Sequence, residues 1–143
     1  MNDNPRLELD LNRSQIGLKF ETEFCVNEAV QNGFMETFHD RNPLHISNEY
    51  AHAVGFKSKV MQGNILNGFI SYFVGEVLKS SQLALITQSI RYKNPVYLND
   101  VLKLHVVLMD ISEANKMYIF GYEFKNEQVV ADGKFQCVQI VNT

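Results

Sequence analysis

Every second position from Leu18 to Val26 is apolar except Thr22, a pattern typical of a strand with one buried face. Residues 28–38 then change to helical spacing, and Asn27 is a suitable N-cap for this helix. Ser47 is a suitable N-cap for a short second helix that ends at Gly55. The first third of the chain is therefore predicted to be one strand followed by helices.

A long helix and a set of strands are predicted for the rest of the chain. From Asn64 to Leu78, apolar residues cover more than half of the helical circumference, which indicates a buried helix. Alternation returns further on, and it predicts antiparallel strands at 83–96, 101–111, 117–124 and 134–141. A sheet wrapped around one buried helix is an α+β arrangement, which we expect to form a single domain over residues 1–143.

Composition narrows the possible functions. The net charge is −3, and no cluster of lysines and arginines is interleaved with aromatics as in nucleic-acid-binding surfaces. The most apolar run, residues 65–78, is too short for a membrane span, and no signal peptide precedes it. We therefore expect a cytoplasmic protein, with Cys25 and Cys137 as buried or half-buried free thiols.

Chemistry concentrates in the loop HDRNPLH, which places Asp40 and His45 on either side of Asn42 and Pro43. Pro43 forces Asn42 into an extended conformation, so the chain turns between the acid and the imidazole. Asp40 alone would fit a turn cap, and His45 alone would fit a hydrogen-bonded core residue. The N–H of Gly63, at the start of the long helix, adds a hydrogen-bond donor for a carbonyl oxygen.

A metal site is the weaker interpretation of the same region. The spacings of His39, Asp40, His45 and His52 match no helical or ribbon pattern of metal ligands, so we expect no metal.

The segments DRNPLH, YAHAVGF, QGNILNGFIS and RYKNPVYLNDVLKL together resemble the signature of the MaoC-like dehydratases and (R)-specific enoyl-CoA hydratases. The resemblance covers roughly residues 15 to 140. It implies a hot-dog fold, usually dimeric, and reversible syn addition of water to a trans-2-enoyl thioester carried on CoA or an acyl carrier protein. No cofactor is implied.

Site residues follow from the same resemblance. Asp40 and His45 would be the catalytic pair, and the Gly63 N–H the oxyanion donor. Ser71 would help to hold the loop, as would the turn residues Asn42 and Pro43. Water addition needs a polarised carbonyl, an activated water and a proton at C2, which these groups can supply. The sequence leaves open whether Asp40 or His45 is the base, although we favour Asp40.

This chain departs from the family at several positions. Gln62 replaces the usual histidine before Gly63, and Phe38 with His39 replaces small residues before the acid. We expect Gln62 to support the site. The expected substrate contacts are Phe38, Phe69, Lys57 and Lys59.

Two other functions remain open. One is a hot-dog thioesterase, although Glu76 lies too late in the long helix, and we expect it to be too buried, for that chemistry. The other is a non-catalytic subunit that binds acyl thioesters in a narrowed pocket. The hydratase interpretation requires Asp40, His45 and the Gly63 N–H to surround one small cavity.

Overall fold

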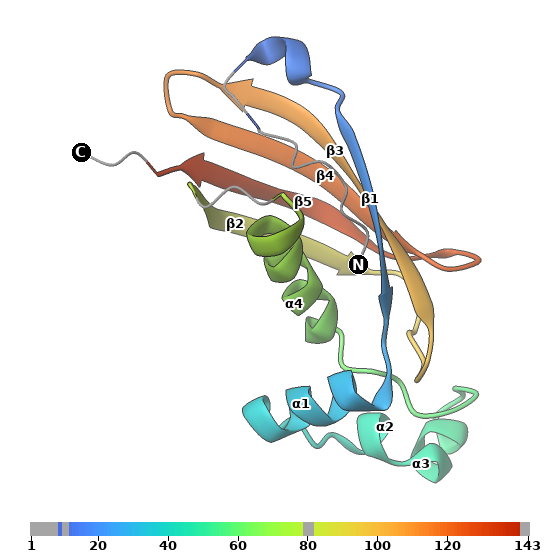
Figure 1. Ribbon diagram of the computed structural model, residues 1–143. Helices are drawn as coiled ribbons and strands as arrows, with labels where there is room; N and C mark the ends of the chain where they lie inside the picture. The colour runs from blue at the N-terminus through green and yellow to red at the C-terminus, as the bar shows by residue number, and fades with distance from the viewer. Residues whose placement is uncertain (1–8, 10–11, 79–81, 141–143) are drawn as a thin grey trace.

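A computed structural model of the chain describes residue 9 and residues 12–78 and 82–140. Short helices and one central helix precede most of the sheet (Figure 1). The helical elements are η1 (Arg13–Gln15), α1 (Glu28–Phe38), α2 (Pro43–Ile46), α3 (Asn48–Ala53), α4 (Asn64–Tyr72) and η2 (Phe73–Val77). The strands are β1 (Lys19–Cys25), β2 (Leu83–Tyr92), β3 (Val101–Ser112), β4 (Met117–Lys125) and β5 (Val129–Gln139).

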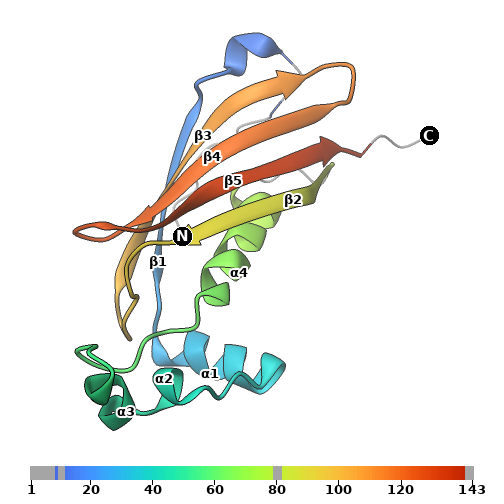
Figure 2. The ribbon, with the colours of Figure 1, turned by 180° about the vertical axis from the view of Figure 1, so that it is seen from behind.

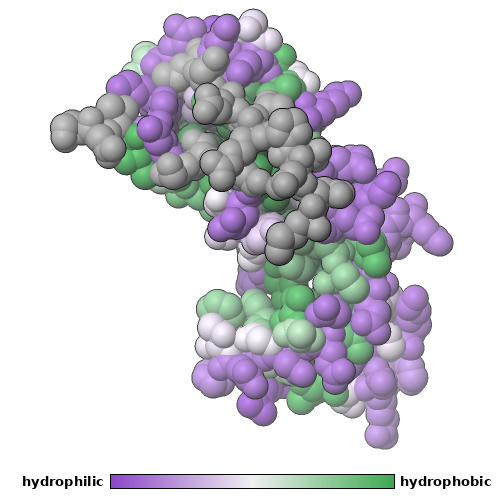
Figure 3. All heavy atoms as spheres, in the orientation of Figure 1, coloured by the Kyte–Doolittle hydropathy of each residue, from purple (hydrophilic) through white to green (hydrophobic). Residues whose placement is uncertain are grey.

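The five strands form one curved antiparallel sheet in the order β1-β3-β4-β5-β2. Helix α4 lies against one face of this sheet, and α1, α2 and α3 gather beyond one end of it (Figures 1 and 2). The molecule narrows where these helices join the sheet, and hydrophobic side chains are visible there (Figure 3). This arrangement confirms the predicted α+β hot-dog fold.

The core fills the space between α4 with η2 and the sheet. Phe73 and Phe120 each pack against Phe135, with ring centroids 6.1 Å and 4.8 Å apart, and all three rings are fully buried. Along β4, alternate residues are buried as the two-residue period predicts: Tyr118, Phe120, Tyr122 and Phe124. The predicted long helix ends in a π-helical turn, in which the Leu78 N–H donates to the Phe73 carbonyl at 3.0 Å.

Local capping residues fix where the early helices begin. Asn27 caps α1 by accepting from the Val30 N–H at 3.0 Å, and Ser47 caps α3 by accepting from the Tyr50 N–H at 3.1 Å. Gly55 adopts φ +98° after α3, a conformation that favours glycine. These three predicted boundaries are confirmed. Helix α2, a single turn within the predicted loop, was not expected.

The two cysteines differ in environment. Cys137 is fully buried in β5, and this burial raises the pKa of its thiol to about 12. Cys25 is exposed at the end of β1, so the expectation that both thiols are at least half-buried is wrong for Cys25. Its side chain falls on the outer face because β1 alternates strictly. Neither cysteine forms a disulfide. In the ranges described above, no helix is long and apolar enough to cross a membrane.

Candidate active site

Helix α2 brings Asp40 and His45 together. Asn42 is its N-cap and accepts from the Leu44 N–H at 3.0 Å, with Pro43 in the first turn. The Asn42 N–H in turn donates to Asp40 Oδ1 at 3.3 Å. One helical turn later, His45 Nε2 lies 3.6 Å from Asp40 Oδ2. Asn42 and Pro43 therefore shape the turn that pairs the acid with the imidazole.

A main-chain carbonyl determines which nitrogen of His45 carries the hydrogen. His45 Nδ1 lies 2.7 Å from the Val60 carbonyl oxygen, which can only accept a hydrogen bond. Nδ1 is therefore protonated, and in the neutral ring Nε2 presents a lone pair towards Asp40. His45 Nε2 and Asp40 Oδ2 are then two hydrogen-bond acceptors that lie 3.6 Å apart. A molecule with two O–H groups, such as water, can donate one hydrogen bond to each of them.

Two buried glutamines contact the main chain of the same loop. Gln31 Nε2, from α1, donates to the His45 carbonyl at 2.9 Å. Gln62 Nε2 donates to the Asp40 carbonyl at 3.2 Å. Gln62 was expected to support the site, whereas Gln31 was not identified. A polar residue on an amphipathic helix gives no sign in the sequence that it points inward, although Gln31 is 1% exposed.

The N-terminus of α4 provides the expected backbone donor. Gly63 is its N-cap position, with no side-chain cap. The Gly63 N–H makes no hydrogen bond to any of the described residues. The Tyr92 ring packs against this residue, since a Cβ added at Gly63 would lie 2.7 Å from it. The donor is therefore free at the positive end of the helix dipole.

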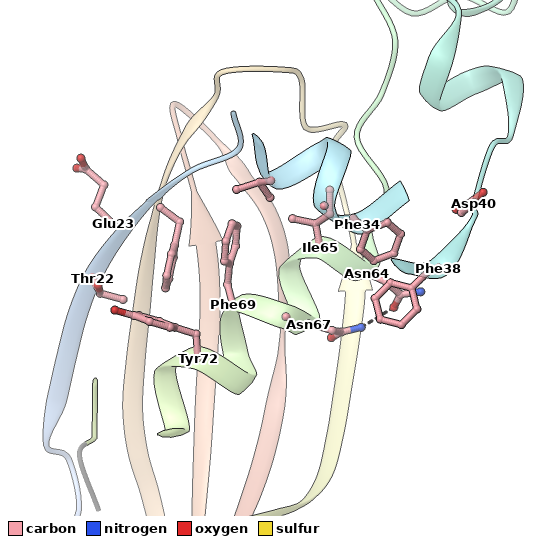
Figure 4. Close-up of a pocket in the computed structure, with 14 residues that line it drawn as sticks. Thr22, Glu23, Phe34, Phe38, Asp40, Asn64, Ile65, Asn67, Phe69 and Tyr72 are labelled. Carbon is pink, nitrogen blue, oxygen red and sulfur yellow. Dashed lines mark hydrogen bonds between the residues drawn. The ribbon is translucent and has the colours of Figure 1, made fainter. Parts of the chain in front are cut away.

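Two cavities border this region. The larger cavity has a volume of about 990 Å³ and lies between β1, α1 and α4 (Figure 4). Phe34 and Phe38 line one part of it, and Phe69 and Tyr72 another, while Asp40 lies beyond Phe38. The smaller cavity, of about 340 Å³, is lined by residues that include His45, Gln62, Gly63 and Tyr92.

The three groups expected around one cavity instead border two cavities that adjoin each other. Asp40 lines the larger cavity, whereas His45 and Gly63 line the smaller one. Ile65 lines both, which shows that the cavities are neighbours. Because α2 pairs the side chains of Asp40 and His45 across the loop, the pair stands where the two cavities meet.

Several predicted residues lie elsewhere. Ser71 is exposed on α4 and makes no hydrogen bond to the loop within the described ranges, so its expected role in holding the loop is wrong. Gln31 and Gln62 make those contacts instead. The reason is geometric, because Ser71 lies two turns beyond the start of α4.

The predicted substrate-binding residues divide into two groups. Phe38 and Phe69 line the larger cavity, and Phe69 stacks on Phe24 with centroids 4.3 Å apart. Lys57 and Lys59 line neither cavity. Lys57 Nζ lies 4.4 Å from the centroid of the Tyr97 ring, and the Lys59 N–H donates to Asn48. The two aromatic residues therefore line a cavity, and the two lysines lie outside both cavities.

The exposure of Phe38 and Glu76 also matters for the site, and it changes the expectation for Glu76. Phe38 is 66% exposed, so it borders the cavity without closing it. Glu76 is exposed on η2, not buried as expected, and it lines neither cavity. The described residues contain no group of three or more His, Cys, Asp or Glu side chains arranged to hold a metal ion.

Comparison with known proteins places the chain in a family. The family model of the MaoC-like domain matches residues 12–128. The chain belongs to the MaoC-like domain family. One curated relative, a mitochondrial 3-hydroxyacyl-[acyl-carrier-protein] dehydratase from Arabidopsis thaliana, is 27% identical over 80% of this chain and 70% of its own length.

Two further proteins, both named as hydratases, are also similar to this chain. The (R)-specific enoyl-CoA hydratase of Rhodospirillum rubrum is 30% identical over 57% of this chain and 56% of its own length. A solved structure of an unliganded R-hydratase from Pseudomonas aeruginosa has a TM-score of 0.79 and 24% identity, covering 89% of this chain and 83% of the other. The named relatives are hydratases and dehydratases, which are lyases, and the structural likeness supports the fold.

Proposed function

We propose that this MaoC-like protein is a lyase that interconverts trans-2-enoyl and (R)-3-hydroxyacyl thioesters by reversible addition of water. The observation that carries the proposal is the pairing of Asp40 Oδ2 with His45 Nε2 at 3.6 Å, next to the N-terminus of α4. Family membership and the names of the relatives support the same reaction class.

In the proposed mechanism, the thioester oxygen accepts a hydrogen bond from the Gly63 N–H, which makes C3 electrophilic. A water held by Asp40 and His45 loses a proton to the pair as its oxygen bonds to C3. The C2=C3 π electrons move towards the thioester oxygen and give an enolate. The pair then returns a proton to C2, so that one water is added overall.

We assign Asp40 as the base towards the water and His45 as the residue that orients it. The hydrogen bond from Nδ1 to the Val60 carbonyl holds the His45 ring with its Nε2 lone pair facing the water position, as the orienting role requires. The reaction is redox-neutral and its proton acceptors are side chains, so the proposal requires no cofactor.

The larger cavity is the proposed site for the acyl chain. Its aromatic lining of Phe34, Phe38, Phe69 and Tyr72 favours an apolar group over a polar one. The names of the two curated relatives specify different carriers, one an acyl carrier protein and the other CoA. We therefore propose an acyl thioester of fatty-acid metabolism as substrate, and the assay below compares both carriers.

A homodimer is part of the proposal. Strand β2 is an edge of the sheet and exposes Leu85, Ile86 and Tyr92 to 36%, 46% and 52%. An edge strand with exposed apolar residues favours pairing with another chain. Sedimentation of the purified chain should give twice the monomer mass of 16.4 kDa. A monomer, or a dimer formed only with a different chain, would contradict this part.

Hydration of crotonyl-CoA tests the proposed activity. We expect loss of the enoyl absorbance and formation of (R)-3-hydroxybutyryl-CoA, without release of free thiol. The same assay with crotonyl-acyl carrier protein compares the carriers. Thiol release without hydration would instead indicate a thioesterase, which the position of Glu76 outside both cavities disfavours. Thermal stabilisation by acyl-CoA without turnover would indicate a non-catalytic subunit.

A further inference from the structure

Gln31 and Gln62 are the only buried side chains with an amide or a charged group in the part of the chain that the structure describes. They come from different elements, the middle of α1 and the turn that precedes α4. Both use their Nε2 amide as a donor to a main-chain carbonyl in the loop between α1 and α3. Burying a polar side chain is costly unless it makes hydrogen bonds. The two buried glutamines both meet this cost by bonding to the same loop, which indicates that the loop needs these two contacts.

The two acceptors are the carbonyls of the proposed catalytic residues. Gln31 Nε2 lies 2.9 Å from the carbonyl of His45, and Gln62 Nε2 lies 3.2 Å from the carbonyl of Asp40. The Asp40 side chain is less constrained than its main chain, because it is 44% exposed and lies 3.6 Å from His45 Nε2. The main chain at each end of the loop is therefore fixed by one buried amide.

We infer that Gln31 and Gln62 are positioning residues that set the separation of Asp40 and His45 for the reaction. The inference rests on the proposed function. Neither glutamine needs to touch the substrate, since each acts through the backbone of a residue that does. A change in geometry of about 1 Å at reacting groups can reduce a rate about 100-fold, so small shifts of the loop matter.

The side-chain oxygen of Gln62 argues against a purely structural role for this residue. Gln62 Oε1 is buried, and no described residue donates a hydrogen bond to it. An unpaired buried acceptor destabilises the folded state, and an apolar side chain of the same length would avoid that cost. The glutamine at position 62 is therefore poorly suited to stability alone, while its Nε2 suits the position of Asp40.

The test compares Gln31→Met and Gln62→Met, which keep the side-chain length and remove the amide. Tyr122→Phe is the matched control, because it removes a hydrogen bond of 2.8 Å from a buried hydroxyl to the Ser89 carbonyl, and Tyr122 lines neither cavity. We would measure kcat and KM with crotonyl-CoA, the Tm, and the ¹⁵N shifts of the His45 ring, assigned with a His45→Ala variant.

We expect kcat to fall about 10- to 100-fold in both methionine variants, with KM changed less than threefold. The Tm of Gln62→Met should equal or exceed that of the wild type. Tyr122→Phe should lower the Tm and keep kcat. The ¹⁵N shifts of Nδ1 and Nε2 in His45 should move closer together in the methionine variants, as its hydrogen bond to Val60 loosens.

Wild-type kcat in both methionine variants would overturn the inference, as would a fall in kcat that only follows the fall in Tm across all three variants. If Gln31→Met does not fold, Gln31→Asn keeps the amide, shortens its reach and should give the same loss of kcat. If the wild type shows no hydration, the proposed function fails separately. The His45 shifts then decide the inference alone, and unchanged shifts in both variants overturn it.

Discussion

The core beneath the sheet and the loop that carries Asp40 and His45 are stabilised in different ways. In the core, Phe73, Phe120 and Phe135 are fully buried and contact one another. In the loop, the Asp40 side chain is 44% exposed, and the main chain is held by single hydrogen bonds, from Gln31 to the His45 carbonyl and from Gln62 to the Asp40 carbonyl. Substitutions in the core should therefore affect stability, and substitutions in the loop should affect activity.

The largest effect on stability is expected for a substitution in the core. Phe135→Ala removes a fully buried ring and should lower the free energy of unfolding by about 3–5 kcal/mol. Phe38→Ala is the control, because that ring is 66% exposed and should cost no more than about 0.5 kcal/mol. Urea unfolding of both variants measures the difference. Equal losses would contradict the comparison.

A substitution at Gly63, where the loop meets the central helix, should have a smaller effect on stability. Gly63 has φ −61° and ψ −34°, which any residue can adopt, so Gly63→Ala acts only through contacts. Its Cβ would meet the Tyr92 ring at 2.7 Å, and overpacking should cost about 1–3 kcal/mol. Adding Tyr92→Ala should remove that penalty in a double-mutant cycle. Additive losses in the double variant would show that the contact with Tyr92 is not the cause.

Alkaline pH should also destabilise the core, with a loss that grows with each pH unit. Burial raises the pKa of Cys137 from 9.0 to about 12, and burial also raises that of Tyr122 from 10.0 to about 12. The unfolded chain releases the Cys137 proton above about pH 9 and the Tyr122 proton above about pH 10, while the folded chain keeps both. Stability should therefore fall as the pH rises from 9 towards 12, by about 1.4 kcal/mol per pH unit for each group.

Urea midpoints at pH 8 to 11 measure this loss, and Cys137→Ala should reduce its slope. The first part of the slope, between pH 9 and 10, belongs mainly to Cys137, because Tyr122 in the unfolded chain titrates near 10.0. An identical slope in Cys137→Ala would contradict the assignment to this thiol.

The same contrast explains what the sequence could predict. The strands and the central helix follow from apolar periodicity, because burial of β4 and α4 repeats over many residues. The caps Asn27 and Ser47 follow from their side-chain chemistry. These features depend on local pattern, so one sequence is enough to find them.

The loop depends on contacts between distant segments, and there the sequence was less informative. Gln31 bonds a residue fourteen positions later, and nothing in the spacing of α1 marks it as buried. Ser71 was assigned to the loop by resemblance, but it lies on an exposed side of α4. The pairing of Asp40 with His45 was found because both residues lie on one short turn.

The central claim is that Asp40 and His45 together activate water, and crotonyl-CoA hydration by Asp40→Asn and His45→Ala tests it most directly. Each variant should lose about 10²- to 10⁴-fold in kcat, as expected for removal of a general acid–base group. Both should keep the wild-type circular dichroism spectrum. Hydration at the wild-type rate in both folded variants would contradict the account.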